Sequence, residues 1–255
     1  MSSFALDKRI FNPSLYKQLT NIWLAGVDTK GQELQEDVAK RWFRSDPELD
    51  GICRENFLHA LEAIGPERLP VPTADPFIQE LGAIAEQERN GDGSQAAWTA
   101  LSMVLLLDQM PRNIFRTADG LVKVYNHYDK IALALVRRLL SPASPIPRPD
   151  LHPQWRNSFS HRMWFYLPLE HSEEIENHKT IDDILAEFSK DTEKSQDLNA
   201  TKNLLQGFVK AEQEHRGVLD RFGRYPHRNI ALGRESTEEE KAHLKDGGAT
   251  FGVAQ

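Results

Sequence analysis

The sequence has very little cysteine, since Cys53 is the only one in 255 residues. One thiol cannot form an intrachain disulfide and cannot provide a cysteine-rich metal site, as is usual for proteins of a reducing compartment. Ile52 and Phe57, the apolar residues near Cys53, indicate a buried thiol rather than a nucleophile. We therefore expect neither a disulfide scaffold nor thiol catalysis.

Long apolar runs are also missing. The apolar run Met103–Leu107 is far too short to span a bilayer, and the opening segment MSSFALDKRIFNP has no apolar core of the signal-peptide kind. We expect a soluble, cytoplasmic protein that has no membrane partner.

The chain is acidic and has no continuous basic segment. The formal net charge is -7, and there is no long run of Lys and Arg. Nucleic-acid surfaces and polybasic membrane anchors both need concentrated positive charge. We therefore expect no nucleic-acid partner.

Sequence motifs for cofactors and metals are missing as well. No Walker loop, Rossmann glycine fingerprint, Gly-x-Ser-x-Gly elbow or HExxH segment occurs. His161, His171 and His178 are spaced ten and seven residues apart, whereas a helical zinc pair takes positions i and i+4. We expect no cofactor and no metal site.

What the sequence does contain is helical periodicity. Apolar residues recur at helical spacing through most of the chain, with no series of alternating strands, so the pattern predicts an all-α fold. We expect one helical domain over residues 1–245 and a flexible, Gly-rich tail over 246–255. The expected helices are Pro13–Leu24, Gln32–Phe43, Pro47–Ile64, Pro76–Asn90, Ser94–Leu107, Gly120–Leu140, Ser158–Asn177, Ile181–Lys190, Ala200–Phe222 and Thr237–Lys245. At the last of them, Ser236 and Glu239 have the spacing of a capping box.

The first polar motif is LDQMPRNIFR, which follows the apolar run of the fifth expected helix. Asp108 continues the apolar face that begins at Trp98, which is a costly place for a carboxylate near a helix end. It should therefore be paired, and the nearest cations in the sequence are Arg112 and Arg116. The pair could be a structural clasp or part of a site.

The second motif is FYLPLEHSEE. In a continuous helix one face would carry Tyr166, Glu170, Glu173 and Asn177. Pro168 is a possible kink. Glu170 beside His171 places a carboxyl group next to a side chain that titrates near neutrality, as general acid–base catalysis requires. A polar helix start with acids in its first turn explains the same residues equally well.

The third motif is RFGRYPHRNIALGRE. It concentrates cationic and potentially cationic side chains in an otherwise acidic protein: Arg221, Arg224, His227, Arg228 and Arg234. Such a density requires anions, which arginine binds in bidentate fashion. The anion could be a ligand, or it could be the protein's own carboxylates on Asp108, Glu170, Glu173 and Glu235.

These motifs resemble the most characteristic segments of a protein family, the domain of unknown function 924 (DUF924). LDQMPRNIFR, FYLPLEHSE, EHRGVLDRFGRYPHRN and LGREST occur in the order of that family, and the resemblance runs from Trp23 to about Leu244. It implies a tetratricopeptide-like, right-handed superhelix of antiparallel helix pairs. Long proline-rich loops near Pro70 and Ser141 suggest a fungal-type member.

The resemblance implies the fold and leaves the activity open, because the family has no general function. One departure from the family pattern concerns the site. His178 stands where the family usually has Gln, seven residues after the His of the EHSE segment. A role carried by that amide in the family does not transfer to this chain.

The leading hypothesis is a cofactor-independent enzyme of hydrolase, lyase or isomerase type. Its polar pocket would bind a small anionic molecule. The candidate catalytic residues are Glu170, His171, His227 and Asp108. The candidate substrate-binding residues are Arg112, Asn113, Arg116, Glu173, Arg224, Arg228 and Asn229.

Two alternatives remain open. The chain could be a non-catalytic tetratricopeptide-like module that uses the same arginines to bind acidic or C-terminal peptides. The motifs could also form one internal network of ion pairs, in which every arginine finds a carboxylate of the protein. Burial separates these alternatives, because a closed pocket favours chemistry and a solvated groove favours peptide binding.

Overall fold

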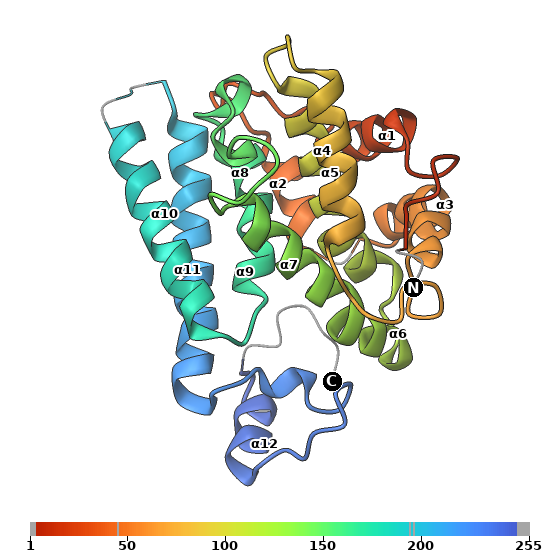
Figure 1. Cartoon of the computed structure of the whole chain (residues 1–255). Coiled ribbons are helices and arrows are strands. Elements are labelled where there is room, and N and C mark those ends of the chain that lie inside the picture. Colours follow the sequence, from red (N-terminus) through yellow and green to blue (C-terminus); the bar gives the residue numbers. More distant parts are fainter. Residues whose placement is uncertain (1–3, 45, 194, 196, 249–255) are drawn as a thin grey trace.

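The computed structural model of the protein describes residues 4–44, 46–193, 195 and 197–248 (Figure 1). Within them the chain is all-α and contains no strand, as predicted. The α-helices are α1 (Pro13–Trp23), α2 (Glu36–Phe43), α3 (Pro47–Ala63), α4 (Asp75–Gln87), α5 (Ser94–Ile114), α6 (Ala118–Lys123), α7 (Asp129–Leu139), α8 (Phe159–Arg162), α9 (Leu167–Glu170), α10 (Ile175–Glu193), α11 (Asn199–Phe222) and α12 (Glu238–Lys245). A π-helical turn, η1 (Val124–Tyr128), joins α6 to α7. The 3₁₀ segments are η2 (Pro149–Leu151), η3 (Pro153–Trp155), η4 (Met163–Phe165) and η5 (Pro226–Arg228).

Helix α5 is the centre of the hydrophobic core. Its buried positions run all round the helix, from Ala96 to Ile114, which is typical of a helix enclosed by others. It packs against α1, α3, α4 and α7, and Figure 1 shows it running through the upper right part of the molecule among these helices. Because other helices enclose α5, a polar side chain buried on this helix is a candidate functional residue.

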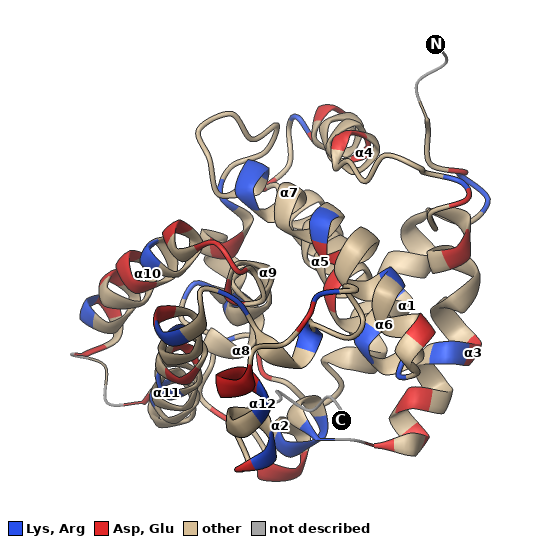
Figure 2. Ribbon diagram, turned by 90° about the horizontal axis from the view of Figure 1, so that it is seen from below, with Lys and Arg blue, Asp and Glu red and all other residues tan. Residues whose placement is uncertain are grey.

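Helices α10 and α11 form a long antiparallel pair on one side of the molecule, and α12 lies below α11 (Figure 1). Helix α11 ends at Gly223, whose φ of 68° lies in the left-handed region that glycine adopts without strain. The chain turns there into η5 and the third polar motif. Acidic and basic residues alternate along both helices of the pair (Figure 2).

The fifth expected helix is longer than predicted. It was expected to end at Leu107, but α5 continues to Ile114 and includes Pro111. A proline removes one backbone donor and usually ends a helix, yet this one lies within a turn of the helix end. Asp108 therefore lies inside the helix, more than a turn before its C-terminus, and not at its end.

The predicted continuous helix Ser158–Asn177 is wrong. The segment breaks into α8, η4 and α9, and α10 begins only at Ile175. Pro168 lies in the first turn of α9, and it has no N–H to continue a helix from the residues before it. Glu170 and Glu173 consequently do not share one helix face with Tyr166.

The capping box of the last helix is shifted by one residue. Thr237, not Ser236, caps α12, and Glu240, not Glu239, returns the hydrogen bond to the cap. Helix α12 ends at Lys245, while most of the predicted tail, residues 249–255, lies outside the described residues. Among the described helices, none is long and apolar enough to cross a membrane.

Candidate acid–base site

Two of the three polar motifs meet at Asp129, the first residue of α7. Its Oδ1 accepts a hydrogen bond from Arg112 Nη2 at 2.8 Å, and its Oδ2 lies 3.9 Å from Nη1 of Arg228. Arg112 comes from the first motif and Arg228 from the third. The two motifs therefore lie close together as expected, but they are joined by a carboxylate that the sequence analysis did not single out.

The second motif joins this cluster through Asp108 and His171. Oδ1 of Asp108 accepts a hydrogen bond from Nδ1 of His171 at 2.8 Å, and Gln109 Nε2 donates to its Oδ2 at 2.6 Å. Asp108 is 1% exposed. Burial disfavours its charge, but His171, Arg112 and these hydrogen bonds outweigh burial and lower the pKa of Asp108 to about 2. Asp108 is the ionised partner of the pair.

The contact with Asp108 also fixes the state of the His171 ring. Burial and the charge of Arg112 lower the pKa of His171. A neutral ring that donates from Nδ1 to Asp108 carries its lone pair on Nε2. The pair therefore presents Nε2 of His171 as a base, oriented by a buried carboxylate.

Glu170, the last residue of α9, lies next to this pair and has no comparable partner. Glu170 is 3% exposed, and its Oε1 has no hydrogen-bond partner among the described residues. Burial raises the pKa of this carboxyl well above its usual value, and the carboxylates of Glu212 and Asp108 add to the effect. An isolated carboxyl group of this kind favours the protonated form, which can donate a proton.

His215 and Tyr225 both contact Glu170. Nδ1 of His215 lies 3.8 Å from its Oε1, but that nitrogen donates to the backbone carbonyl of Ala211 at 2.8 Å. Burial lowers the pKa of His215 to about 3, so the ring is neutral. The hydroxyl of Tyr225 donates to the backbone carbonyl of Glu170 at 2.9 Å.

Two further candidates, Arg228 and His227, lie in the same region. The guanidinium of Arg228 is 4.7 Å from the ring centre of Tyr125 and 4.8 Å from that of Tyr225. Arg228 is 8% exposed, and its Nε is buried without a hydrogen-bond partner in the part of the chain that the structure describes. His227 lies beside it, and burial together with the charge of Arg228 lowers the pKa of His227 to about 2.

The other predicted site residues have partners within the protein. Arg116 forms two hydrogen bonds with the carboxylate of Asp50. Asn113 is near its helix end, where its amide donates to the carbonyl of Gln109 at 2.9 Å. The structure places neither the amide of Asn113 nor the guanidinium of Arg116 against Glu170 or His171. Both side chains therefore bind partners outside the central cluster.

A second set of predicted residues holds the third motif against α12. Arg224 binds both carboxylate oxygens of Glu240, and the amide of Asn229 donates to Oε2 of the same residue at 3.2 Å. Glu173 forms a bidentate ion pair with Arg234. These contacts explain much of the arginine density by the protein's own acids.

His178 has a defined role in the same region. Its Nδ1 lies 2.7 Å from Oε1 of Glu212, and its Nε2 donates to the carbonyl of Ser172 at 2.9 Å. Burial opposes charge on the ring, but these two hydrogen bonds raise the pKa of His178 above its usual value. His178 therefore places an imidazole whose protonation is favoured beside Glu212.

The sequence analysis missed three residues of this cluster, namely Asp129, Glu212 and His215. A signal was present for two of them. On α11, the apolar stripe of Leu205 and Phe208 continues through Glu212 and His215 at helical spacing, and both are buried. The same argument had singled out Asp108 on α5.

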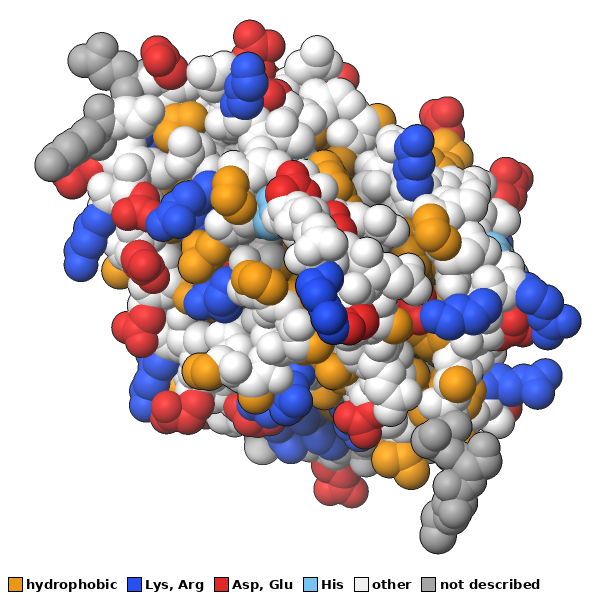
Figure 3. Space-filling view, turned by 45° about the horizontal axis from the view of Figure 1, so that its top comes forward, with side chains coloured by type: hydrophobic (Ala, Val, Ile, Leu, Met, Phe, Trp, Pro, Cys, Tyr) orange, Lys and Arg blue, Asp and Glu red, His pale blue; other side chains and the backbone are white. Residues whose placement is uncertain are grey.

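Among the described residues, no three His, Cys, Asp or Glu side chains are grouped so that they could hold a metal ion. The surface offers charges of both signs. On the face shown in Figure 3, Lys and Arg side chains are interspersed with Asp and Glu.

The fold and the cluster define an all-α protein with a buried carboxyl, an Asp–His pair and two arginines at the junction of α5, α7, α9 and η5. The chain belongs to the family described as "Bacterial protein of unknown function (DUF924)", which matches residues 19–248. It is also similar to the solved structure of a protein of unknown function, ATU0120, from Agrobacterium tumefaciens. The two are 26% identical with a TM-score of 0.58, and the match covers 94% of this chain and 100% of the other. None of the curated proteins matches the chain.

Proposed function

We propose that the protein is a cofactor-independent acid–base enzyme that acts on a small anionic molecule. The observation that carries this proposal is the buried carboxyl of Glu170, which lacks a hydrogen-bond partner on Oε1 and has a raised pKa. A folded protein normally pairs its buried polar groups, because each unpaired one costs about 1–3 kcal/mol. Strongly perturbed carboxyl groups of this kind concentrate at catalytic sites.

In this proposal Glu170 donates a proton to the substrate, and Nε2 of His171 accepts one from it. Asp108 positions the imidazole and holds it in the tautomer with the lone pair on Nε2. Hydrolysis, elimination and isomerisation each need one proton delivered and one removed, so all three fit this pair of groups. His227, neutral and buried near Arg228, is the third candidate for proton transfer.

The anion would bind between Arg112 and Arg228. Arg228 is supported by two tyrosine rings and meets Asp129 only at 3.9 Å, which leaves its donors incompletely used. The Nε atom of Arg112 is likewise buried without a partner among the described residues. A carboxylate or phosphate of the substrate would match these donors.

Arg116, Arg224 and Glu173 already have ion-pair partners in the protein. We assign them, with Asn113 and Asn229, to the frame that positions Arg112 and Arg228.

Burial supports an enzyme over a peptide-binding module. A groove that captures acidic peptides needs solvated arginines, whereas Arg228 and His227 are both buried.

The proposal keeps three finer expectations: a tetratricopeptide-like right-handed superhelix, a fungal-type member of the family, and a cytoplasmic location.

The proposal is tested by a thermal-shift titration of the whole chain with inorganic phosphate and with small mono- and dicarboxylates. A ligand that binds only the native state raises Tm by mass action. We expect an anion to raise Tm of the wild type and of Arg224→Ala, which removes the ion pair with Glu240 and a hydrogen bond to the backbone carbonyl of Glu235. Arg228→Ala should lose the response, and an equal response of Arg228→Ala would overturn the assignment.

A further inference from the structure

Arg228 differs from the other arginines of the polar motifs in its contacts with carboxylates. Among the described residues, the nearest carboxylate oxygen is Oδ2 of Asp129, 3.9 Å from Nη1, which is too far for a hydrogen bond. Arg112 donates from Nη2 to Asp129 at 2.8 Å and to Asp108 at 3.4 Å. The remaining arginines of the motifs form direct ion pairs, namely Arg116, Arg221, Arg224 and Arg234. Arg228 therefore has donors to offer to a ligand.

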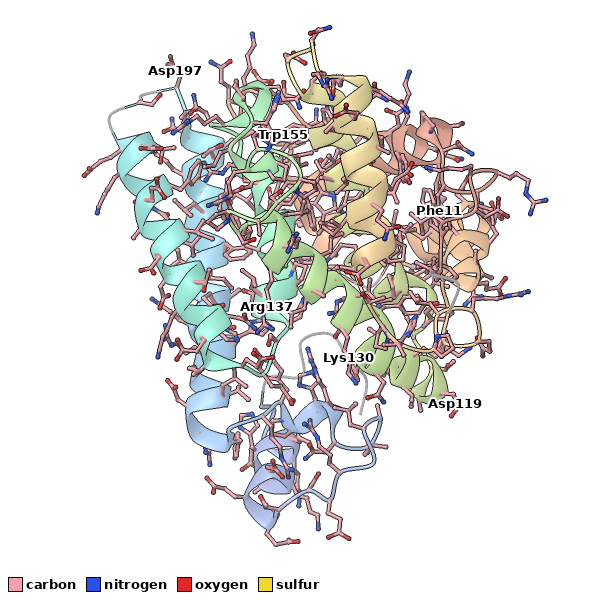
Figure 4. All side chains as sticks on the ribbon, viewed as in Figure 1. Phe11, Asp119, Lys130, Arg137, Trp155 and Asp197 are labelled. Carbon is pink, nitrogen blue, oxygen red and sulfur yellow. The ribbon has the colours of Figure 1, made fainter. Side chains whose placement is uncertain are left out.

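The terminal nitrogens of Arg228 are open to solvent. The side chain of Arg228 is 10% exposed, and those of its neighbours Asp129 and Arg112 are 13% and 22% exposed. Nε of Arg228 is buried without a partner, whereas Nη1 and Nη2 form no hydrogen bond with the described residues and are not closed off. Figure 4 labels Lys130, the residue after Asp129, on the side of α7 that faces η5 and α12. A ligand can reach the outer edge of the guanidinium from this side.

Two tyrosine rings restrict how an anion can approach Arg228. The guanidinium carbon lies over the ring of Tyr125 at 4.7 Å and over that of Tyr225 at 4.8 Å. The faces of aromatic rings carry partial negative charge, so they repel anionic oxygens that lie outside the guanidinium plane. The donors at the edge of a guanidinium lie in one plane and match the two oxygens of a carboxylate. A tetrahedral phosphate or sulfonate would direct its further oxygens out of this plane.

The charges around Arg228 suit a ligand with one negative charge. Arg112 is already held by two carboxylates of the protein, so its charge is shared between them. Burial and the charge of Arg112 lower the pKa of His171, and burial with the charge of Arg228 lowers the pKa of His227 to about 2. Neither ring therefore adds a cation at neutral pH. A second negative charge on the ligand would lie near Asp129 without a buried counter-charge.

Lys130 is the next cation along the chain, and it does not change this balance. Its side chain is exposed, so solvent weakens its attraction for a charge held at Arg228.

From this arrangement we propose that the anion bound at Arg228 is a monocarboxylate, and that Asp129 excludes dianions. This inference rests on the proposed function, because it names the substrate class for the same anion position. The two carboxylate oxygens of the ligand accept hydrogen bonds from Nη1 and Nη2 of Arg228. Asp129 is the specificity-determining residue, since its negative charge lies beside the position that a second anionic group would take.

The test is a calorimetric titration of the full chain at constant ionic strength and mildly alkaline pH, where phosphate is a dianion. Acetate, propionate and benzoate are the monocarboxylates, and succinate and inorganic phosphate are the dianions. Methanesulfonate is a monoanion whose three oxygens cannot all lie in the guanidinium plane. We expect at least one monocarboxylate to bind, and the dianions and methanesulfonate to bind about tenfold more weakly or not at all.

Asp129→Asn is the decisive variant, because its amide oxygen can still accept from Arg112 while the negative charge is removed. It should strengthen succinate and phosphate binding by about tenfold relative to the monocarboxylates. Asp119→Asn is the matched control, since it removes the same charge from an exposed position of α6, labelled in Figure 4, and should leave the affinities unchanged.

Arg228→Lys is a second, independent variant. Lysine keeps the positive charge but lacks the planar pair of donors, so the preference for monocarboxylates over methanesulfonate should disappear. The Tm of each variant is measured alongside, so that a loss of folding is recognised.

The outcomes separate this inference from the proposed function. Wild type that binds succinate or phosphate as tightly as the monocarboxylates, with the binding lost in Arg228→Ala, would overturn the monocarboxylate assignment and leave the anion site in place. Unchanged selectivity in an Asp129→Asn variant with the Tm of wild type would overturn the role of Asp129. Absence of binding by every anion would contradict this inference and the proposed function together.

Discussion

Nδ1 of His171 lies 2.8 Å from Oδ1 of Asp108, and Asp108 is a carboxylate buried inside the central helix of the core. Because Asp108 is ionised and deeply buried, its role is to orient and stabilise the side chains that it contacts. Beside this pair, Oε1 of Glu170 is buried without a hydrogen-bond partner among the described residues. Glu170 and His171 are neighbours in one short segment, yet their environments differ. In the proposed mechanism His171 is oriented as the base and Glu170 is held as the acid.

Glu170→Gln should abolish turnover and stabilise the protein. The folded-state pKa of Glu170 is raised, so the native state holds a proton that the unfolded chain releases above 4.5. Native stability therefore decreases as pH rises from 4.5 toward the folded pKa, and Gln removes this decrease. At neutral pH we expect a gain of about 1 kcal/mol, measured by urea unfolding against pH. A Gln variant that is less stable than wild type at neutral pH would contradict this.

Asp108→Asn should destabilise the protein and impair catalysis together. Removing one partner of a buried charge pair typically costs about 3–5 kcal/mol, and Asn also weakens the preference of His171 for the Nδ1–H tautomer. The folded pKa of Asp108 is lowered, so its contribution exists above 3.8 and is lost as pH falls toward about 2. Acid unfolding followed by circular dichroism should show this loss in wild type and not in the variant.

His178→Gln introduces the residue that the family resemblance predicts at this position. The pKa of His178 is raised, so its stabilising contribution is complete below 6.5 and is lost as pH rises through the folded pKa. The variant should be less stable than wild type by about 1–2 kcal/mol in mild acid, and the difference should shrink in alkali. Thermal unfolding at a series of pH values measures it, and a difference that grows with pH would refute the assignment.

Arg116→Ala should have little effect on catalysis or on anion binding. Arg116 pairs with Asp50 at a partly exposed position, and such pairs contribute about 0–1 kcal/mol. The comparison with Arg228→Ala in the same thermal-shift titration separates the arginine of the proposed site from an arginine of the frame. Loss of anion binding in Arg116→Ala would show that the site extends to the end of α5.

Much of the fold could be predicted, because apolar residues recur at helical spacing along helices such as α3 and α11. The segment around Pro168 could not, since almost all of its residues are buried and no polar face marks where one helix ends. The extension of α5 past Pro111 was missed for a different reason, because proline is usually a stop signal and here costs only one hydrogen bond near the helix end.

The site could be predicted only in part. Asp108 stands out because it interrupts an apolar stripe, and this reasoning holds in the structure. The partners of the arginines could not be read from the sequence, because Arg116 and its acid, Asp50, are 66 positions apart. Long-range pairs of this kind depend on how helices pack, which local spacing does not encode.

The most direct test of the central claim is the protonation state of Glu170. Carbon-13 NMR of the side-chain carboxyl groups, with Glu170→Gln for assignment, follows its titration in the intact protein. The raised pKa predicts a carboxyl signal that titrates at higher pH than the signals of the exposed glutamates. A Glu170 signal that titrates together with those of the exposed glutamates would contradict the proposed role as a proton donor.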